Sequence, residues 1–238
     1  MNHVANHFRL RLIATLCAIL GLLGTHAAAT VISPNLPPGS KYELLFVTLD
    51  STAATSTNIA TYNAFAAAEA QLSPALKTLP PSVQWHAVAS TNSVNAIVNA
   101  QDNDIPVYNT RGVLVATALS GLYDSGLTSP VQFNQFGNSE TTLVWTGSNG
   151  LGGVVSNGQM GNDNDVAQGL SSAVNTSWIF NQNTTQSVNS FPIYALSSPI
   201  TVPTPEPSTV AILGSGLLIP IGHYFLRWRR WHRKPTGQ

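Results

Sequence analysis

Histidine is the scarcest of the residues in this chain that could do acid–base or metal chemistry. Of the six histidines, only His86 lies between residues 30 and 198. A histidine zinc site needs several converging ligands, so a site here would have to use carboxylates instead. A Ser-His-Asp triad would have to use His86, and no Gly-x-Ser-x-Gly elbow supplies its serine. Because a general base needs geometry as well as presence, we interpret His86 as a half-buried strand residue and expect no catalysis.

Two acidic clusters could hold a calcium ion, namely DND at Asp102 to Asp104 and GNDND at Gly161 to Asp165. Carboxylate and amide oxygens at alternate positions can converge on Ca²⁺, although neither segment has the glycine and downstream glutamate of an EF-hand. The alternative is an Asx-rich turn whose side chains bond their own backbone. Asp163 and Asp165 are the stronger calcium candidates, and we expect no other cofactor.

A third group places polar side chains beside an aromatic ring, a composition found in many sugar sites. This candidate ligand-binding shelf consists of Trp145, Thr146, Ser148 and Asn149. The alternative places Trp145 in the core and makes the Gly-Ser-Asn stretch a turn. We favour the core for Trp145 because Leu143 is expected to share its face in an alternating strand. The spacing of carboxylates selects no pair for glycoside cleavage.

The elements expected to position these residues in the first half of the chain alternate between strand and helix. KYELLFVTL predicts a strand over residues 41–49, and the spacing of apolar residues predicts a helix that ends at Leu72, with Ser56 or Thr57 as its N-cap. A second strand is expected over 83–90. A short helix should follow over 94–100, with Asn92 or Ser93 as its cap.

Turn residues dominate the second half. Two β-rich runs flank Asn109 to Gly112 in residues 104–117, which predicts a hairpin with Gly112 available for a positive φ. One or two helical turns should follow over 118–127. Residues 141–153 predict a strand that runs into a glycine loop, and residues 149–169 look too polar and glycine-rich for a regular element. A closing strand is expected over 191–200.

Two stretches carry a family resemblance: IPVYNTRGVLVATALSGLYDSG and, about twenty residues later, VWTGSNGLGG. They resemble the endostatin-type branch of the C-type-lectin-like fold, in which a Val-Pro-x-x-Asn hairpin precedes a helical turn and a later Trp-x-Gly-Ser strand end. The opening YELLFVT with its alanine-rich helix is similar to the start of that fold, and Trp178 fits its core. The resemblance covers about residues 41–202 and implies an α+β domain with long polar loops.

The binding chemistry of that family is not carried over. The only cysteine is Cys17, whereas animal relatives are pinned by disulfides. Neither the Glu-Pro-Asn or Gln-Pro-Asp nor the Trp-Asn-Asp tripeptide of sugar-binding C-type lectins is present. The zinc site and basic heparin surface of endostatin are also missing, because residues 30–198 hold one histidine and three basic residues.

The formal net charge of zero conceals an acidic middle between basic ends. Lys41, Lys77 and Arg111 are the only basic residues of the middle, against nine acidic ones, which makes its formal charge −6. DNA or RNA would be repelled by this charge, so we expect no nucleic-acid partner.

The N-terminus is typical of a signal peptide. A basic start through Arg11 leads into LIATLCAILGLLG and then Ala27-Ala28-Ala29, so we expect signal peptidase to remove residues 1–29. The apolar run is too short to span a bilayer comfortably. Cys17 would be lost with it, which leaves a mature protein without disulfides or thiolate sites.

The C-terminus has three parts in a fixed order. Residues 199–209 form a proline-spaced linker, residues 210–226 form an apolar segment barely long enough to span, and residues 227–238 are basic, which favours a cytoplasmic end. The pattern resembles the PEP-CTERM sorting signal, which a membrane exosortase of Gram-negative bacteria recognises. Its motif would be Pro205, Glu206, Pro207, Ser208 and Thr209, and its basic stop Arg227, Arg229, Arg230, Arg233 and Lys234.

These patterns together predict an exported bacterial protein. It would be inserted transiently in the inner membrane before processing, and would then reach the cell surface or extracellular matrix. Residues 30–198 would form one C-type-lectin-like domain that binds or organises exopolysaccharide, with hydroxyl and amide groups suited to neutral glycans. The alternatives are a secreted hydrolase that uses Asp102, Asp163 or Asp165 on matrix polymer, and a purely structural or adhesive surface protein.

Overall fold

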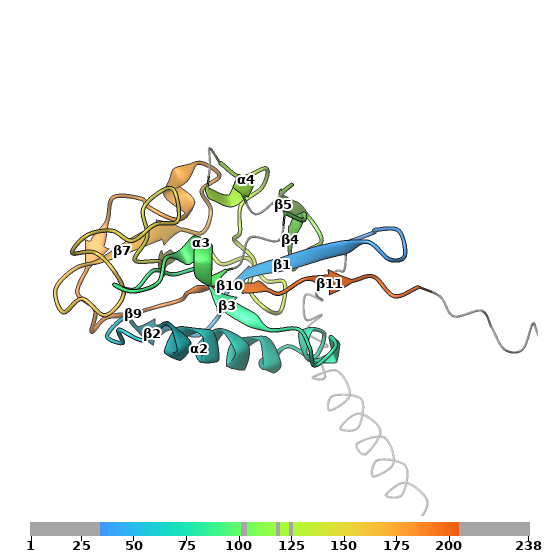
Figure 1. Ribbon diagram of the computed structural model, residues 1–238, viewed down its shortest axis with the longest axis horizontal. Coiled ribbons are helices and arrows are strands. Elements are labelled where there is room, and N and C mark those ends of the chain that lie inside the picture. Colours follow the sequence, from blue (N-terminus) through green and yellow to red (C-terminus); the bar gives the residue numbers. More distant parts are fainter. Residues whose placement is uncertain (1–33, 101–103, 118–119, 124–125, 205–238) are drawn as a thin grey trace, which may run out of the picture. The chain divides into compact units, whose positions relative to one another are not determined.

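The computed structural model describes residues 34–100, 104–117, 120–123 and 126–204, and it has a mixed α+β fold (Figure 1). The chain divides into two compact units. The larger contains residues 41–200, and the described part of the smaller contains residues 36–40 and 201–204. Within the smaller unit Gly39 N donates to Val202 O and Val202 N donates to Ser40 O, both at 2.9 Å.

The predicted regions at the two ends lie outside the described residues. These are the signal peptide over 1–29, the Pro-Glu-Pro motif with Ser208 and Thr209, the apolar segment over 210–226 and the basic tail. In the described part of the chain, no helix is both long enough and apolar enough to cross a membrane.

The main sheet is built around β1 (Lys41–Val47), whose residues after Lys41 are all buried. Strand β1 pairs antiparallel with β10 (Tyr194–Ser197) and parallel with β4 (Val107–Asn109). The order is β3-β10-β1-β4-β5, where β3 is Trp85–Ala87 and β5 is Leu114–Ala116, and β11 (Ile200–Thr201) also pairs with β1. The opening strand, the hairpin and the closing strand are therefore confirmed, although each is shorter than predicted.

Strand β1 ends at Val47 instead of Leu49 because side chains replace the sheet ladder there. Leu49 N donates to Gln135 Oε1 at 3.0 Å, and Asp50 N donates to Glu69 Oε2 at 3.1 Å. Both acceptors lie far along the chain, so the sequence pattern of the strand could not show where it stops.

Helix α2 (Ile59–Leu72) packs against β3 and β10. Its N-cap is Asn58, not Ser56 or Thr57, because Asn58 Oδ1 accepts the hydrogen bond from Ala60 N at 3.0 Å. Ser56 instead anchors the approach to the helix: Tyr62 Oη accepts from Ser56 N and donates to Ser56 O, each at 2.9 Å. Burial raises the pKa of Tyr62 to about 12, so the phenol stays protonated and remains a donor.

A second sheet has the order β6-β7-β8, formed by Leu143–Trp145, Val166–Leu170 and Thr184–Thr185. Strand β7 corrects the prediction that residues 149–169 contain no regular element. Its glycine is required by packing, since a Cβ on Gly169 would lie 1.9 Å from Trp178 O. A two-stranded ribbon pairs β2 (Thr52–Ala53) with β9 (Ser190–Phe191).

The other helices among the described residues are single turns: α3 (Ala96–Asn99), α4 (Ser120–Tyr123), η1 (Leu76–Thr78) and η2 (Thr176–Trp178). The residue that precedes α3 is Asn95, not Asn92 or Ser93. Ala96 N at the start of α3 donates instead to Ser90 Oγ at 2.8 Å, an acceptor from the preceding loop. The hydroxyl of Ser90, six residues before Ala96, thus replaces the cap that the sequence predicted.

The core of the larger unit is apolar and gathers around Trp178. The indole Nε1 of Trp178 donates to Leu122 O at 2.9 Å, and its backbone carbonyl accepts from Tyr194 Oη at 2.8 Å. The rings of Trp178 and Tyr194 lie 5.3 Å apart. The prediction that Trp178 belongs to the core is confirmed.

One type of turn occurs three times in the loops. In each, an asparagine Oδ1 accepts hydrogen bonds from the backbone N–H groups two and four residues later. The glycine three residues after the asparagine has a positive φ of 71°, 80° or 72°. This geometry is that of a type I turn followed by a left-handed residue. The three asparagine–glycine pairs are Asn109 and Gly112, Asn134 and Gly137, and Asn149 and Gly152.

Candidate functional site

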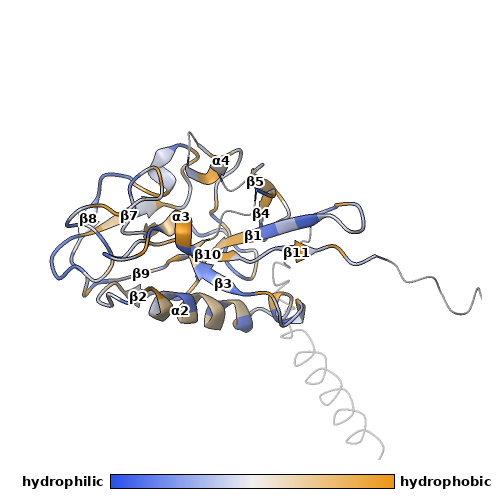
Figure 2. Ribbon diagram, in the orientation of Figure 1, coloured by the Kyte–Doolittle hydropathy of each residue, from blue (hydrophilic) through white to orange (hydrophobic). Residues whose placement is uncertain are grey.

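Polar side chains gather on two neighbouring loops, one before β7 and one around β8, which we name the polar loop surface (residues 156–165 and 181–190). Figure 2 shows hydrophilic residues along these loops. Strand pairing of Val166 with Thr185 and of Ala167 with Thr184 holds the loops side by side. Ser187 Oγ also donates to Asp163 O, at 3.5 Å. Its exposed polar residues are Ser156, Asn157, Asp163, Asn164, Asp165, Gln182, Asn183, Thr184, Gln186, Asn189 and Ser190.

The backbone of the polar loop surface is fixed by its own amides. Asn183 N donates to Asn181 Oδ1 at 3.0 Å, and Asn162 Nδ2 donates to Asp165 O at 3.1 Å. Asn157 and Gln182 have positive φ values of 61° and 64°, which residues other than glycine adopt uncommonly. The exposed side chains are therefore presented from loops whose main chain is already hydrogen-bonded internally.

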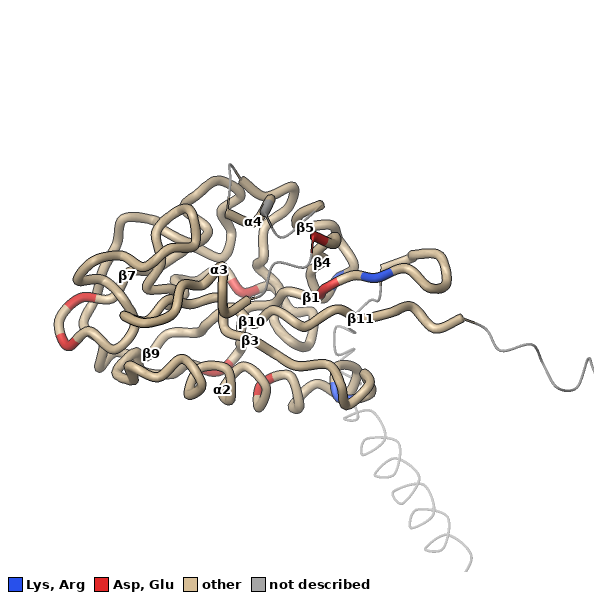
Figure 3. Tube along the Cα trace, viewed as in Figure 1, with Lys and Arg blue, Asp and Glu red and all other residues tan. Residues whose placement is uncertain are grey.

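The two calcium candidates, Asp163 and Asp165, lie on this surface and are both exposed. Figure 3 shows acidic positions at the loop that precedes β7. Neither loop contains Lys or Arg. Within the described ranges, no three His, Cys, Asp or Glu side chains come together around a metal-sized space. Calcium binding by Asp163 and Asp165 accordingly stays a prediction, and Asp102 lies outside the described residues.

The candidate shelf around Trp145 lies in the interior. Trp145, Thr146 and Ser148 are each fully buried. The Trp145 ring packs edge-on against Phe191 at 4.9 Å, and its Nε1 donates to Thr52 O at 3.0 Å. The core interpretation of Trp145 is therefore correct, although Leu143 is only half-buried.

The polar members of the shelf serve the fold. Thr146 Oγ1 donates to Ile179 O at 2.6 Å, and Ser148 Oγ donates to Thr146 O at 2.8 Å and contacts Ser90 Oγ at 2.8 Å. Asn149 is half-buried and caps its own turn. A ligand that approached from solvent would reach Asn149 but not the other three residues.

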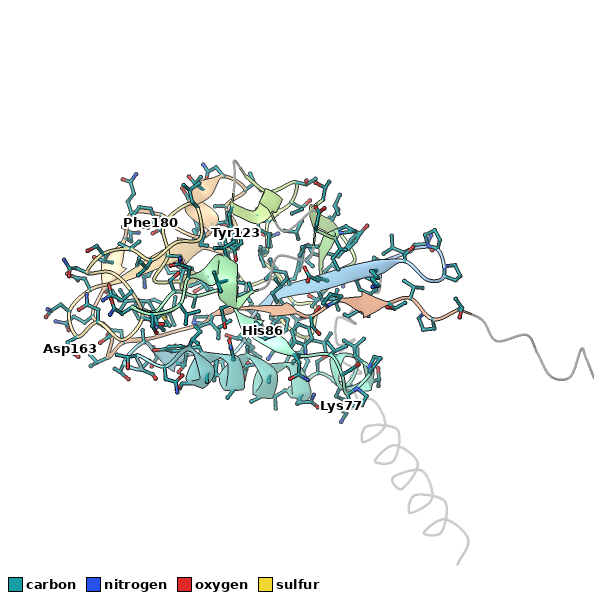
Figure 4. All side chains as sticks on the ribbon, in the orientation of Figure 1. Lys77, His86, Tyr123, Asp163 and Phe180 are labelled. Atoms are coloured by element: carbon teal, nitrogen blue, oxygen red, sulfur yellow. The ribbon has the colours of Figure 1, made fainter. Side chains whose placement is uncertain are left out.

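His86 lies in β3 opposite Leu196 and is half-buried, which confirms the interpretation made from sequence. Burial lowers the pKa of its imidazole, so the neutral form dominates at pH 7. Figure 4 shows His86 and Asp163 in separate parts of the larger unit. The structure thus does not bring the histidine to the polar loop surface.

One buried carboxylate, that of Glu69, was not predicted from the sequence. Glu69 on α2 is 3 % exposed, and its Oε2 accepts from Gln135 Nε2 at 2.7 Å as well as from Asp50 N. Glu69 therefore ties the helix to the end of β1 and to the turn at Asn134. The signal was available, since Glu69 is the only charged residue of an otherwise neutral helix.

The chain matches no known protein-family model, and none of the curated proteins is significantly similar to it.

Proposed function

We propose that this chain is an exported, non-catalytic protein of the bacterial cell surface or extracellular matrix, which associates with exopolysaccharide through the polar loop surface. The observation that carries the proposal is the dense set of exposed amides and hydroxyls on two loops whose backbone is held internally. Amide side chains offer both donors and acceptors, which match the hydroxyl groups of a sugar chain. Because few of these side chains carry charge, contact with a neutral glycan would remove few charged groups from water.

We also propose that the domain is C-type-lectin-like. Support comes from the order of its elements: a buried strand, an alanine-rich helix, the Asn109 hairpin, and a Trp145 strand end that leads into the Asn149 turn. Trp178 in the core agrees with the same resemblance. A solved structure whose connections between these elements differ from that fold would contradict this part of the proposal.

Binding can be tested on the purified chain with a neutral polysaccharide coupled to beads. We expect retention by the wild type and a loss of at least fivefold in Asn183→Ala/Thr184→Ala/Gln186→Ala, since three exposed hydrogen-bonding side chains are removed. Gln71→Ala on α2 is the matched control, because it truncates an exposed amide away from the surface. No retention of the wild type over an unrelated protein would reject the proposal.

The route of export is a separate part of the proposal. Signal peptidase would remove residues 1–29, and an exosortase would act at the motif around Glu206 and release the protein from the inner membrane. Intact mass of the protein recovered outside the cell tests this route. A mature protein that still carries residues 210–238 would show that the tail is a permanent anchor instead.

A further inference from the structure

The outward face of α2 carries no charge. Its exposed residues are Ala60, Thr61, Ala64, Ala68, Gln71 and Leu72, which we name the α2 face. Leu72 is 53 % exposed, and the only charged residue of the helix, Glu69, points into the interior. A helix that covers a globular protein normally places charged or polar residues on its outer side. Four of the six exposed residues of the α2 face are alanine or leucine and none is charged, so a partner could cover this side without the desolvation of any ion.

The two ends of the α2 face carry opposite charges. Lys77 is exposed on η1, which follows the C-terminal end of the helix. At the N-terminal end, Gly161 lies against the backbone of Ser56 and Thr57, because an added Cβ would be 2.7 Å from Ser56 O. Asp163 and Asp165 follow Gly161 directly, so the acidic loop adjoins that end of the helix. Figure 4 shows Lys77 and Asp163 at opposite ends of α2.

We propose that the partner on the α2 face is a second copy of this chain, packed through a two-fold axis with the two α2 helices antiparallel. A two-fold interface pairs residue i with j and j with i. An axis near the middle of α2 therefore sets Ala64 of one copy against Ala68 of the other, and Ala60 against Leu72. Alanine side chains let two helices approach closely.

Charge complementarity selects this occupant and this orientation. The antiparallel arrangement places Lys77 of each copy beside Asp163 and Asp165 of the other. A parallel arrangement would instead set like charges together at both ends. Elsewhere the acidic domain repels its own copy, whereas the α2 face can be buried without the desolvation of any charge.

The size of the contact sets its strength. A helix of 14 residues is about 21 Å long, and a contact limited to one such face falls below the roughly 1,200 Å² typical of stable complexes. The association is therefore weak and reversible, and it becomes populated where copies are crowded. This inference goes beyond the proposed function and does not depend on glycan binding.

Sedimentation velocity over a concentration series tests the proposal. The full chain is expressed in a host that exports it and is purified in the form in which it is recovered. We expect the weight-average sedimentation coefficient of the wild type to rise with concentration. Ala64→Glu should abolish the rise, because it buries a carboxylate against Ala68 of the other copy on each side of the axis. Circular dichroism checks that this exposed helix substitution leaves the fold intact.

A charge swap tests the orientation. Lys77→Glu should raise the dissociation constant about threefold or more, and Lys77→Glu/Asp163→Lys/Asp165→Lys should restore it. Lys41→Glu is the matched control, since Lys41 is an exposed lysine on β1 and is not part of the α2 face, and it should leave the association unchanged. A wild type that stays monomeric, an associating Ala64→Glu variant, or a swap that fails to restore association would each overturn the proposal.

Discussion

The two halves of the larger unit are held together by different interactions. In the first half, β1 inserts consecutive apolar residues into the core, and Leu45, Phe46 and Val47 are each completely buried. In the second half the buried residues are often polar, among them Asn134, Thr146 and Ser148, and they bond to the backbone of loops. Apolar burial is non-directional, whereas each buried hydrogen bond requires one particular partner. The loops can therefore be irregular and still hold a single conformation without disulfides.

The largest expected effect comes from the apolar half. Phe46→Ala should lower the free energy of unfolding by about 3–5 kcal/mol, because the buried ring is lost from between β1 and Trp85, against which it packs at 5.1 Å. Urea denaturation followed by circular dichroism measures the change. Val188→Ala, at a residue 68 % exposed, is the control and should change stability by less than about 0.5 kcal/mol. Equal effects of the two substitutions would contradict the core assignment.

Two occurrences of the same turn, at Asn134 and Asn149, test the second half, in which buried polar residues bond to the backbone of loops. Asn134→Ala should cost about 1–3 kcal/mol of unfolding free energy, because Phe136 N and Asn138 N lose the acceptor that the fully buried Asn134 side chain supplies. Asn149→Ala should cost less, since its turn is half-exposed and water can replace the amide.

Aspartate substitutions sharpen the same comparison, because aspartate keeps the acceptor oxygen. Asn149→Asp should leave stability nearly unchanged. Asn134→Asp should destabilise, since Asn134 Nδ2 also donates to Glu140 Oε1 at 2.8 Å and a carboxylate there would repel Glu140. The four variants are compared by urea denaturation at pH 7. If Asn134→Asp is as stable as Asn149→Asp, the part-buried bond to Glu140 contributes nothing.

A smaller effect is the pH dependence of stability that arises from His86 in the first, apolar half. Burial holds the pKa of His86 in the folded state below the unfolded value of 6.5. The unfolded state therefore binds more protons as pH falls below about 6.5, and stability decreases in that range. His86→Gln should have a flatter dependence of the melting temperature on pH between about pH 7 and pH 5. A slope identical to that of the wild type would show that His86 does not titrate differently on folding.

The smallest expected effect is that of calcium on the polar loop surface. If Asp163 and Asp165 bind Ca²⁺, millimolar calcium should raise the melting temperature of the wild type slightly, because a ligand of the folded state stabilises it by mass action. Asp163→Asn/Asp165→Asn should lose the increase, and magnesium at the same concentration is the control. A wild-type melting temperature that does not change with calcium would show that the two carboxylates do not form a calcium site.

Local signals predicted much of the first half and little of the second. The β-forming residues of 41–49 and the apolar spacing before Leu72 correctly predicted β1 and α2, since both elements follow from their own residues. The sequence predicted the turn at Asn109 and a glycine loop after the Trp145 strand, without the Asn149 turn that forms it, and it did not predict the turn at Asn134. The same motif could have found all three.

The candidate site shows a similar division. Exposure of Asp163 and Asp165 follows from a run of polar and acidic residues. The burial of Thr146 and Ser148 could not be predicted from their types, because hydroxyl residues are mostly exposed. Their burial depends on the carbonyls of Ile179 and Thr146, one of which lies 33 residues away in the chain.

The sequence alone determined the acidic, cysteine-poor character of the middle of the chain, the opening strand and helix, and the alanine-rich composition of α2 with its single charged residue, Glu69. Only the tertiary structure decided that β7 forms within a glycine-rich segment, that Trp145 and its polar neighbours are interior, and that the loops at Asp163 and Asn183 make one surface. The physical reason is the range of the interactions. Periodicity and turn chemistry act between residues a few positions apart, whereas strand pairing and the satisfaction of buried polar groups depend on partners that only folding brings together.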